Sequence, residues 1–380
     1  MSSNLKKFYI IRFLGGFIFT YTIQSVFLIS RGITLPQLAT FASLTIIVST
    51  LMEIPTGFIA DRFGRKYSSA LSYFLDFIAF LVLIFIKDYS LLAVVAVIRG
   101  LSHALASGSF ESLIYEEVAS NSQGKKYIDI TTRGSNITIA VGVVATFFGP
   151  IIYRFNPSLP FILVAIVSLV SALVMLTFEE KIAVGEVKKN LEIIDGIKEI
   201  VKIRPVLLIV LIDLLLLIFV NIYYKVAFFP KIQSLGLDVA YFGVVDVATL
   251  AFTSLLLHYL PKFSFHNHQR TLAIFSLTTA LIFFLFGIAQ HLVPVLIFGM
   301  LFDPAWNLRR HVLPTITNQY FSNHSRALSL STMSFLSNAG AALLIPLATL
   351  LFTKSYIYSL VPILLMVPLL FLYPKNKVNN

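Results

Sequence analysis

Uninterrupted apolar stretches of about 20 residues recur along the whole chain, and they constrain its fold more than any other feature. Each stretch is long enough to cross the hydrocarbon core of a bilayer as an α-helix. Of the 380 residues 57% are hydrophobic and only 12% are charged, too few to cover a soluble core of this size. Strands of an outer-membrane barrel would alternate apolar and polar residues instead. We therefore predict an all-α membrane protein.

Helix length and loop length together limit the number of spans. At about 30 residues per helix and loop, twelve transmembrane helices fit this chain. The predicted helices cover residues 8–30, 36–60, 68–87, 90–118, 130–153, 159–178, 205–230, 236–259, 271–290, 293–320, 326–350 and 355–373.

A polar stretch divides these helices into two equal sets. Residues 1–180 and 205–380 each hold six helices, which we expect to form two pseudo-symmetric six-helix bundles. The segment 181–204 is a cytoplasmic linker, and the helical spacing of its apolar residues predicts an amphipathic helix at 190–202. Equal halves around a polar bridge are typical of transporters built from repeats.

Lysine and arginine are distributed unevenly between alternate loops. With a cytoplasmic N-terminus, 20 of the 29 basic residues lie in inner loops, five in outer loops and four in predicted spans. This bias predicts that both termini are cytoplasmic. It also explains the formal net charge of +11, so we expect no nucleic-acid partner. Short loops favour the plasma membrane of a prokaryote.

The most specific motif follows the second predicted helix. Its six defining positions are Gly57, Asp61, Arg62, Gly64, Arg65 and Lys66. Gly57 lets a neighbouring helix approach closely, Gly64 permits a tight reversal, and the three bases hold the turn on the inner side.

This run resembles the signature G-x-x-x-D-R-x-G-R-K/R between helices 2 and 3 of the major facilitator superfamily, with all six positions present. The resemblance implies two bundles that work by alternating access, with helices 1, 4, 7 and 10 around the cavity. It also implies that the loop is a cytoplasmic latch, in which the acid and the bases bridge the two halves. The alternative is that these charges only fix topology.

Shorter runs extend the resemblance. Arg99-Gly100 is similar to the helix-4 arginine motif, and Gly149-Pro150 resembles the Gly-Pro of the antiporter motif. The run Arg326–Ser329 resembles the start of helix 11 in the drug-exporter branch. The run Ser107–Glu117 is similar to the inner end of helix 4, and the resemblance implies that Glu111 pairs with a base of the latch. These features favour a drug:proton antiporter.

Ionisable residues inside the spans are costly in lipid and mark either a transport pathway or an internal pair. Those in this chain are Glu53, Asp76, Asp213, Asp246 and Asp303 with Arg99, Lys225, Arg309 and Arg310. Proton coupling needs a group that titrates as the site faces each side in turn. Our proton-coupling candidates are Asp76, Arg99, His103, Asp213 and Asp303. An Asp76–Arg99 pair is allowed by depth, and His103 is either a proton relay or a neutral hydrogen-bonding group.

Helix 10 carries the longest polar stripe. Asp303, Asn307, Arg310 and Pro314 share one helical face, and Trp306 flanks it. The stripe either lines the cavity or holds a buried Asp303–Arg310 pair. Polar groups among aromatic rings suit an organic solute that carries charge. Our substrate-binding candidates are Tyr21, Gln24, Arg99, Asn221, Lys225, Asp303, Trp306, Asn307 and Arg310.

The sequence lacks the residues that several kinds of catalysis and cofactor binding require. There is no Cys for disulfides or thiol catalysis, and no phosphate-binding loop for ATP. His266 and His268 have no adjacent third metal ligand, so we expect no metal and no cofactor. No catalytic constellation of an enzyme is present.

We therefore predict a secondary active transporter that works by proton-coupled efflux of a drug-like or amphipathic compound. The alternative is a proton-coupled importer or exporter of an anionic or zwitterionic metabolite, peptide or sugar derivative. A non-transporting receptor or scaffold would have lost the intramembrane charges. The expected partners are a small-molecule substrate, protons and the lipid bilayer, and the expected state is a monomer.

Overall fold

The computed structural model describes residues 2–121, 127–180, 192–262, 267–321 and 326–374. Every regular element among them is helical, which confirms the all-α prediction. Two compact units account for the chain. The first unit contains Met1–Ile33, Leu44–Lys188 and Asp238–Val244, and the second contains Thr34–Ser43, Lys189–Leu237 and Val245–Asn380.

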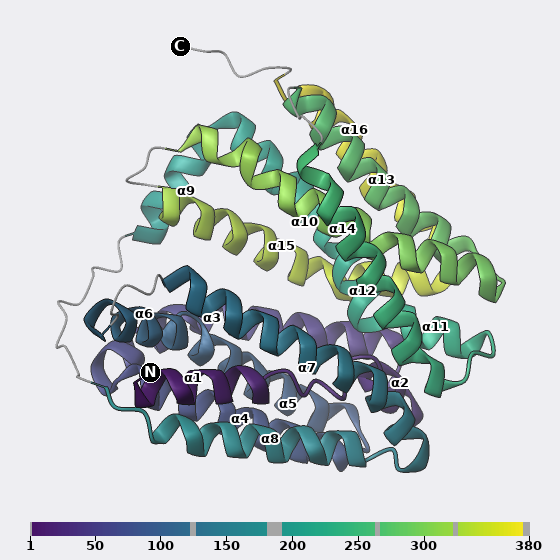
Figure 1. The fold of residues 1–380 in the computed structure, drawn as a ribbon. Helices are drawn as coiled ribbons and strands as arrows, with labels where there is room; N and C mark the ends of the chain where they lie inside the picture. The colour runs from purple at the N-terminus through teal and green to yellow at the C-terminus, as the bar shows by residue number, and fades with distance from the viewer. Residues whose placement is uncertain (1, 122–126, 181–191, 263–266, 322–325, 375–380) are drawn as a thin grey trace. The chain divides into compact units, whose positions relative to one another are not determined.

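The N-terminal half of the sequence forms eight helices (Figure 1). They are α1 (Ser3–Leu14), α2 (Gln24–Ser30), α3 (Leu35–Phe63), α4 (Arg65–Ile84), α5 (Tyr89–Ala106), α6 (Ser109–Asn121), α7 (Tyr127–Phe155) and α8 (Leu159–Leu176). Helix α4 packs between α5 and α8, and α1 packs on α7. An apolar cluster that includes Phe8, Phe110 and Phe178 fills the space between α1, α6 and the end of α8.

The C-terminal half forms the remaining elements. The α-helices are α9 (Glu192–Lys202), α10 (Arg204–Ile222), α11 (Phe228–Ser234), α12 (Phe242–Tyr259), α13 (His268–Ile288), α14 (Leu292–Thr317), α15 (Arg326–Lys354) and α16 (Leu360–Leu372). A π-helix, η1 (Tyr223–Ala227), joins α10 to α11, and the 3₁₀ turns are η2 (Val239–Tyr241), η3 (Leu260–Lys262), η4 (Asn318–Tyr320) and η5 (Tyr356–Ser359).

Nine helical segments of the described residues are long and apolar enough to cross a membrane. The other three predicted spans correspond to the interrupted pair α1 and α2, to α14 with its charged residues, and to the shorter apolar segment Tyr356–Leu372. The total of twelve crossings stays a prediction.

The first predicted helix, 8–30, is wrong as a continuous helix. Residues 15–23 leave the helical conformation between α1 and α2, and this connection packs tightly on α7 (Figure 1). A Cβ built at Gly16 would lie 2.6 Å from the Cβ of Val141, and one at Gly149 would lie 2.1 Å from the carbonyl oxygen of Phe19. The glycines of α7 therefore admit the backbone of the break, and this is the role that the structure gives to Gly149.

Two other boundaries also differ from prediction. The fourth span, 90–118, divides into α5 and α6 at Gly108, whose φ of +71° a side chain would strain. The amphipathic linker helix exists as α9, but it packs on α10 and α15 and so belongs to the second unit. A Cβ built at Gly196 of α9 would lie 2.4 Å from the hydroxyl of Thr332.

Candidate functional site

The break in the first helix lines a cavity of about 280 Å³ within the first unit, which we call the helix-break cavity. Its polar lining includes Tyr21 and Gln24 from the break and Asp76 and Arg99 from α4 and α5. Interrupted membrane helices expose backbone groups where solutes and ions bind, and such interruptions are a pointer to binding sites. The structure thus brings together four of the residues that the sequence singled out.

The Asp76–Arg99 ion pair that depth allows is not formed, although both residues line this cavity. The guanidinium of Arg99 instead lies 3.5 Å from Gln24 Oε1 and 4.6 Å from the centre of the Phe80 ring. Asp76 Oδ1 is buried and accepts no hydrogen bond from the described residues. Equal depth brought the two residues to one cavity, but Phe80 takes the position beside the guanidinium. His103 lies one turn beyond Arg99 and is exposed.

In the second unit the first predicted span corresponds to α10 and α11, and the π-helix η1 interrupts it between these two helices. Tyr223 anchors it by donating to the carbonyl of Gly299 at 2.8 Å and packing against Phe228 and Phe302. A π-helix inside an α-helix is frequent at functional sites. Lys225, a substrate-binding candidate, lies in this turn and is exposed. Each unit therefore has a disrupted helix at the place where the sequence predicts cavity wall.

The buried carboxylate of Asp303 faces η1 and α12. It accepts hydrogen bonds from the hydroxyls of Tyr224 and of Thr253, the latter at 2.6 Å. Asp246 of α12 is close enough to Asp303 to interact with it electrostatically, and its Oδ2 is buried without a hydrogen bond from the described residues. The alternative Asp303–Arg310 pair is therefore wrong, because the carboxylate is turned toward hydroxyl donors and Arg310 is exposed.

A second cavity, of about 420 Å³, lies between α10, α14 and α15, and we call it the arginine cavity. Arg309, with 2% of its side chain exposed, forms an ion pair with Asp213, which keeps 15% exposed. Its Nε donates to Ser276 at 2.9 Å. Trp306 and Arg310 complete the charged and aromatic part of the lining. The base of α14 that forms a buried pair is thus Arg309, one position before Arg310, the base of the pair considered as an alternative.

The two remaining substrate candidates make local contacts. Asn307 Nδ2 donates to the carbonyl of Asp303 at 2.9 Å, and Asn221 Nδ2 donates to the carbonyl of Leu217 at 2.8 Å. Both bonds lie within one helix, so both side chains fold back on their own backbone. Neither residue lines the arginine cavity.

The gating motif lies at the junction of α3 and α4. Gly64 is the one residue between these helices, and its φ of +104° confirms the tight reversal. The carboxylate of Glu180 accepts hydrogen bonds from the backbone N–H groups of Arg65 at 2.8 Å and Lys66 at 3.0 Å. A Cβ at Gly64 would lie 2.9 Å from this carboxylate. Both the positive φ and this close approach therefore require glycine at the position. A carboxylate also suits the positive end of a helix.

The other motif residues are more accessible. Asp61, Arg62 and Gly57 are exposed, and within the first unit a Cβ at Gly57 would meet nothing within 4 Å. The close helix approach predicted at Gly57 is therefore absent from this unit. Arg65 forms an ion pair with Glu116, and Lys66 Nζ donates to the carbonyl of Phe178 at 3.2 Å.

The partner predicted for Glu111 is corrected. Glu111 lies 3.4 Å from Arg12 of α1, whereas the acid that contacts a base of the motif is Glu116. The two glutamates are five residues apart in α6, which puts them about 140° apart around the helix axis. The break at Gly108 sets the rotation of α6, and no periodicity carried across that break could have placed them.

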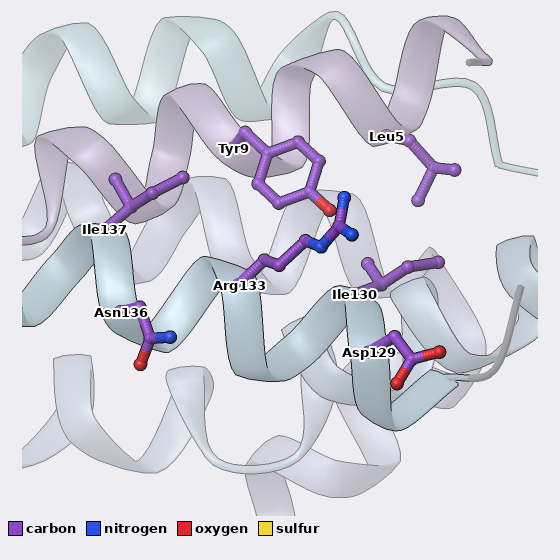
Figure 2. A pocket seen from close by; sticks show the side chains of 7 residues that line it. All are labelled: Leu5, Tyr9, Asp129, Ile130, Arg133, Asn136 and Ile137. Atoms are coloured by element: carbon purple, nitrogen blue, oxygen red, sulfur yellow. The ribbon is translucent and has the colours of Figure 1, made fainter.

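A third cavity, of about 450 Å³, lies between α1 and α7 in the first unit. Figure 2 shows Arg133 extending from α7 toward the ring of Tyr9 on α1, whereas Asp129, one turn earlier, points away from that ring. Arg133 and Asp129 are exposed, so this cavity is open to its surroundings. No candidate residue lines it.

Comparison with known proteins identifies the fold. A match to the Major Facilitator Superfamily covers residues 8–309. The chain belongs to this superfamily. It is therefore a multi-pass membrane protein, and the relatives that it matches are named as transporters.

A curated relative matches part of this major facilitator. The uncharacterized MFS-type transporter YxaM of Bacillus subtilis (strain 168) is 26% identical over 161 residues, which is 42% of this chain and 39% of YxaM. The match thus spans well under half of the relative's length.

Three solved structures have the same fold. Nucleoside transporter NupG has a TM-score of 0.82 at 12% identity and covers 98% of this chain and 100% of its own. A D-xylose-proton symporter has 0.70 at 17% identity with 99% of both chains covered. Peptide transporter POT has 0.72 at 14% identity with 98% of this chain and 95% of its own covered. At these identities the likeness shows the fold alone, and the drug:proton antiporter branch stays a prediction.

Three contributing residues of this major facilitator were not among our site candidates. Arg309 is the buried base, and Tyr224 and Thr253 are the donors to Asp303. A signal for Arg309 existed, because Asp213 at similar depth in α10 needs a base and two adjacent arginines of α14 were available. His266, which we considered as a metal ligand, lies outside the described residues. Within the described residues no group of three or more His, Cys, Asp or Glu could hold a metal.

Proposed function

We propose that this major facilitator couples proton movement to the export of a small organic solute. It would act as a monomer in the plasma membrane, with both termini in the cytoplasm, by alternating access. The observation that carries the proposal is the buried carboxylate of Asp303. Its partners are the hydroxyls of Tyr224 and Thr253, and no ion pair of Asp303 occurs among the described residues. Burial of an unpaired charge is costly, and a proton removes that charge.

The position of Asp303 supports this role. It lies beside the π-helix of the second unit, and Asp246 adds a second carboxylate to the same region. Two carboxylates in one region repel each other when both are ionised, so a proton bound to either of them relieves that repulsion. A solute that displaces η1 would change the hydrogen bond that Tyr224 donates to Asp303.

The direction of transport rests on sequence features. Gly149-Pro150 and Arg326–Ser329 resemble the antiporter and drug-exporter patterns, so we favour export of an amphipathic solute. Asp61 and Arg62, which are exposed at the end of α3, are the motif residues that we propose act as the inner latch. Glu180 would position the motif by fixing the start of α4.

A test uses proteoliposomes that contain the pH-sensitive dye pyranine, with ethidium as an amphipathic cation and benzoate as an organic anion. We expect proton flux opposite to solute movement, and we expect Asp303→Asn to abolish it, because the amide cannot carry the proton. Glu179→Gln, at an exposed acid of the first unit, is the matched control and should keep the flux. Solute flux that is unchanged after the pH gradient collapses, or an Asp303→Asn protein with wild-type proton flux, would contradict the proposal.

An organic anion or zwitterion is the second candidate substrate, transported in either direction. The observation that favours it is the excess of base in the arginine cavity, where Arg309 and Arg310 face a single acid, Asp213. Metabolites, peptides and sugar derivatives with an acid group belong to this class.

A further inference from the structure

The arginine cavity has a net positive lining inside the second unit. Its charged residues are Asp213, Arg309 and Arg310, so one positive charge is left without a counter-charge in the cavity. Within a membrane-spanning bundle an unbalanced charge is costly. An anion that enters the cavity would balance it.

Only part of the Arg309 guanidinium has hydrogen-bond acceptors among the described residues. Its Nη2 is engaged by Asp213 and its Nε by Ser276, but Nη1 is buried and has no acceptor among the described residues. A guanidinium carries five N–H donors, and buried donors without acceptors cost stability. Because Asp213 and Ser276 hold the other nitrogens, the guanidinium is fixed in place, which reduces the entropy lost when an acceptor binds.

Arg310 and Trp306 supply what a purely structural ion pair would not need. Arg310 is exposed, lines the cavity and makes no hydrogen bond or ion pair with the described residues. Trp306 lies 5.8 Å from the Arg309 guanidinium carbon and presents an apolar ring to the same cavity. Leu313 and Met333 extend this apolar wall. A fixed guanidinium, an accessible one and an aromatic surface are the complement of an amphipathic anion.

We infer that the arginine cavity is a binding subsite for the acid group of an organic anion, whose apolar part packs against Trp306. Arg309 and Arg310 bind the acid, and Asp213 positions Arg309 rather than contacting the ligand. This inference rests on the proposed function and names the substrate class, because it places solute binding in the second unit. It predicts that an acid group, rather than size or apolar area alone, determines binding.

The single tryptophan of the chain makes the inference testable without transport. The fluorescence of Trp306 is excited at the red edge of its absorption in the purified full-length protein, with iodide as an anionic quencher, caesium as a cationic one and acrylamide as a neutral one. We expect iodide, normalised to acrylamide, to quench Trp306 more than caesium does. Benzoate should reduce the iodide quenching saturably, and its neutral isostere benzamide should not.

Two variants distinguish binding at Arg310 from a general effect of the positive charge of the protein. Arg310→Gln should raise the benzoate concentration needed by about tenfold or more, the loss expected for one charge-assisted hydrogen bond. Arg270→Gln, at an exposed base at the start of α13, should leave it unchanged. Arg310→Gln should fold, because Arg310 makes no hydrogen bond or ion pair in the described part of the chain.

Equal effects of benzoate and benzamide, or equal behaviour of Arg310→Gln and Arg270→Gln, would overturn the inference. The proposed function fails independently of it. Benzoate binding that depends on Arg310, without solute-dependent proton flux in proteoliposomes, would support the subsite and contradict proton coupling. Proton-coupled ethidium export without any preference for benzoate over benzamide would support proton coupling and contradict the subsite.

Discussion

Removal of the negative charge from Asp213 should destabilise the second unit. In Asp213→Asn the Arg309 guanidinium stays buried but loses its counter-charge, and breaking a buried ion pair from one side costs about 3–5 kcal/mol. We expect about 3 kcal/mol, the lower end, because the Asp213 side chain keeps 15% exposure and water can partly solvate the site. Ser276 continues to hold Nε, so the side chain should not leave its position.

The assay is equilibrium unfolding in detergent, followed by the fluorescence of Trp306, which lies beside Arg309. The double variant Asp213→Asn with Arg309→Gln removes both charges and should recover most of the lost stability. A coupling energy of about 2 kcal/mol between the two changes would follow from a direct pair. An Asp213→Asn protein within about 0.5 kcal/mol of wild type, the range of a surface substitution, would refute this reasoning. Additive effects of the two changes would refute it as well.

Two further predictions concern the first unit. Gly149→Ala should lower the unfolding free energy by about 1–3 kcal/mol, the usual cost of overpacking, because its Cβ would lie 2.1 Å from a backbone carbonyl oxygen. Gly142→Ala on the same helix is the control, since its Cβ would lie 3.7 Å from the nearest side-chain atom; equal losses in the two variants would contradict the packing argument. Glu180→Gln should cost about 1 kcal/mol of stability and slow transport, because the start of α4 loses its charged acceptor. Unfolding and solute-flux measurements check both effects, and a Glu180→Gln protein with unchanged stability would show that the hydrogen bonds of Arg65 and Lys66 do not stabilise the turn.

The sequence predicted the helical architecture because hydropathy is a local property. Each run of apolar residues satisfies its own backbone hydrogen bonds as a helix, so composition alone indicates the element. The reversal at Gly64 was predictable for the same reason, since a short glycine turn between charged residues needs no distant partner. The break between α1 and α2 was not, because glycine also occurs inside continuous membrane helices. That break depends on the close packing of residues 15–23 against Gly149, which lies far along the sequence.

The candidate site divides in the same way. The depth of Asp76 and of Arg99 in the membrane could be calculated from the sequence, because the rise per residue is fixed in a helix. The two depths are similar, and both residues line one cavity. The depths did not predict that Arg99 lies over an aromatic ring. On α14 the side chains of the adjacent residues Arg309 and Arg310 point about 100° apart, so a one-residue difference decides which of them reaches Asp213. That choice depends on the rotation of α14 against α10, which periodicity within one helix does not define.

The interleaved make-up of the two units has a consequence for biosynthesis. The ribosome delivers the chain from the N-terminus, yet the first unit includes Asp238–Val244, which emerges only after several later helices. Gly243 of this segment packs against the backbone of Phe147 on α7, so a Cβ there would lie 2.6 Å from the Phe147 Cα. A fragment that ends before residue 238 would leave this patch of α7 uncovered. Neither half of the gene, expressed alone, therefore encodes a finished unit.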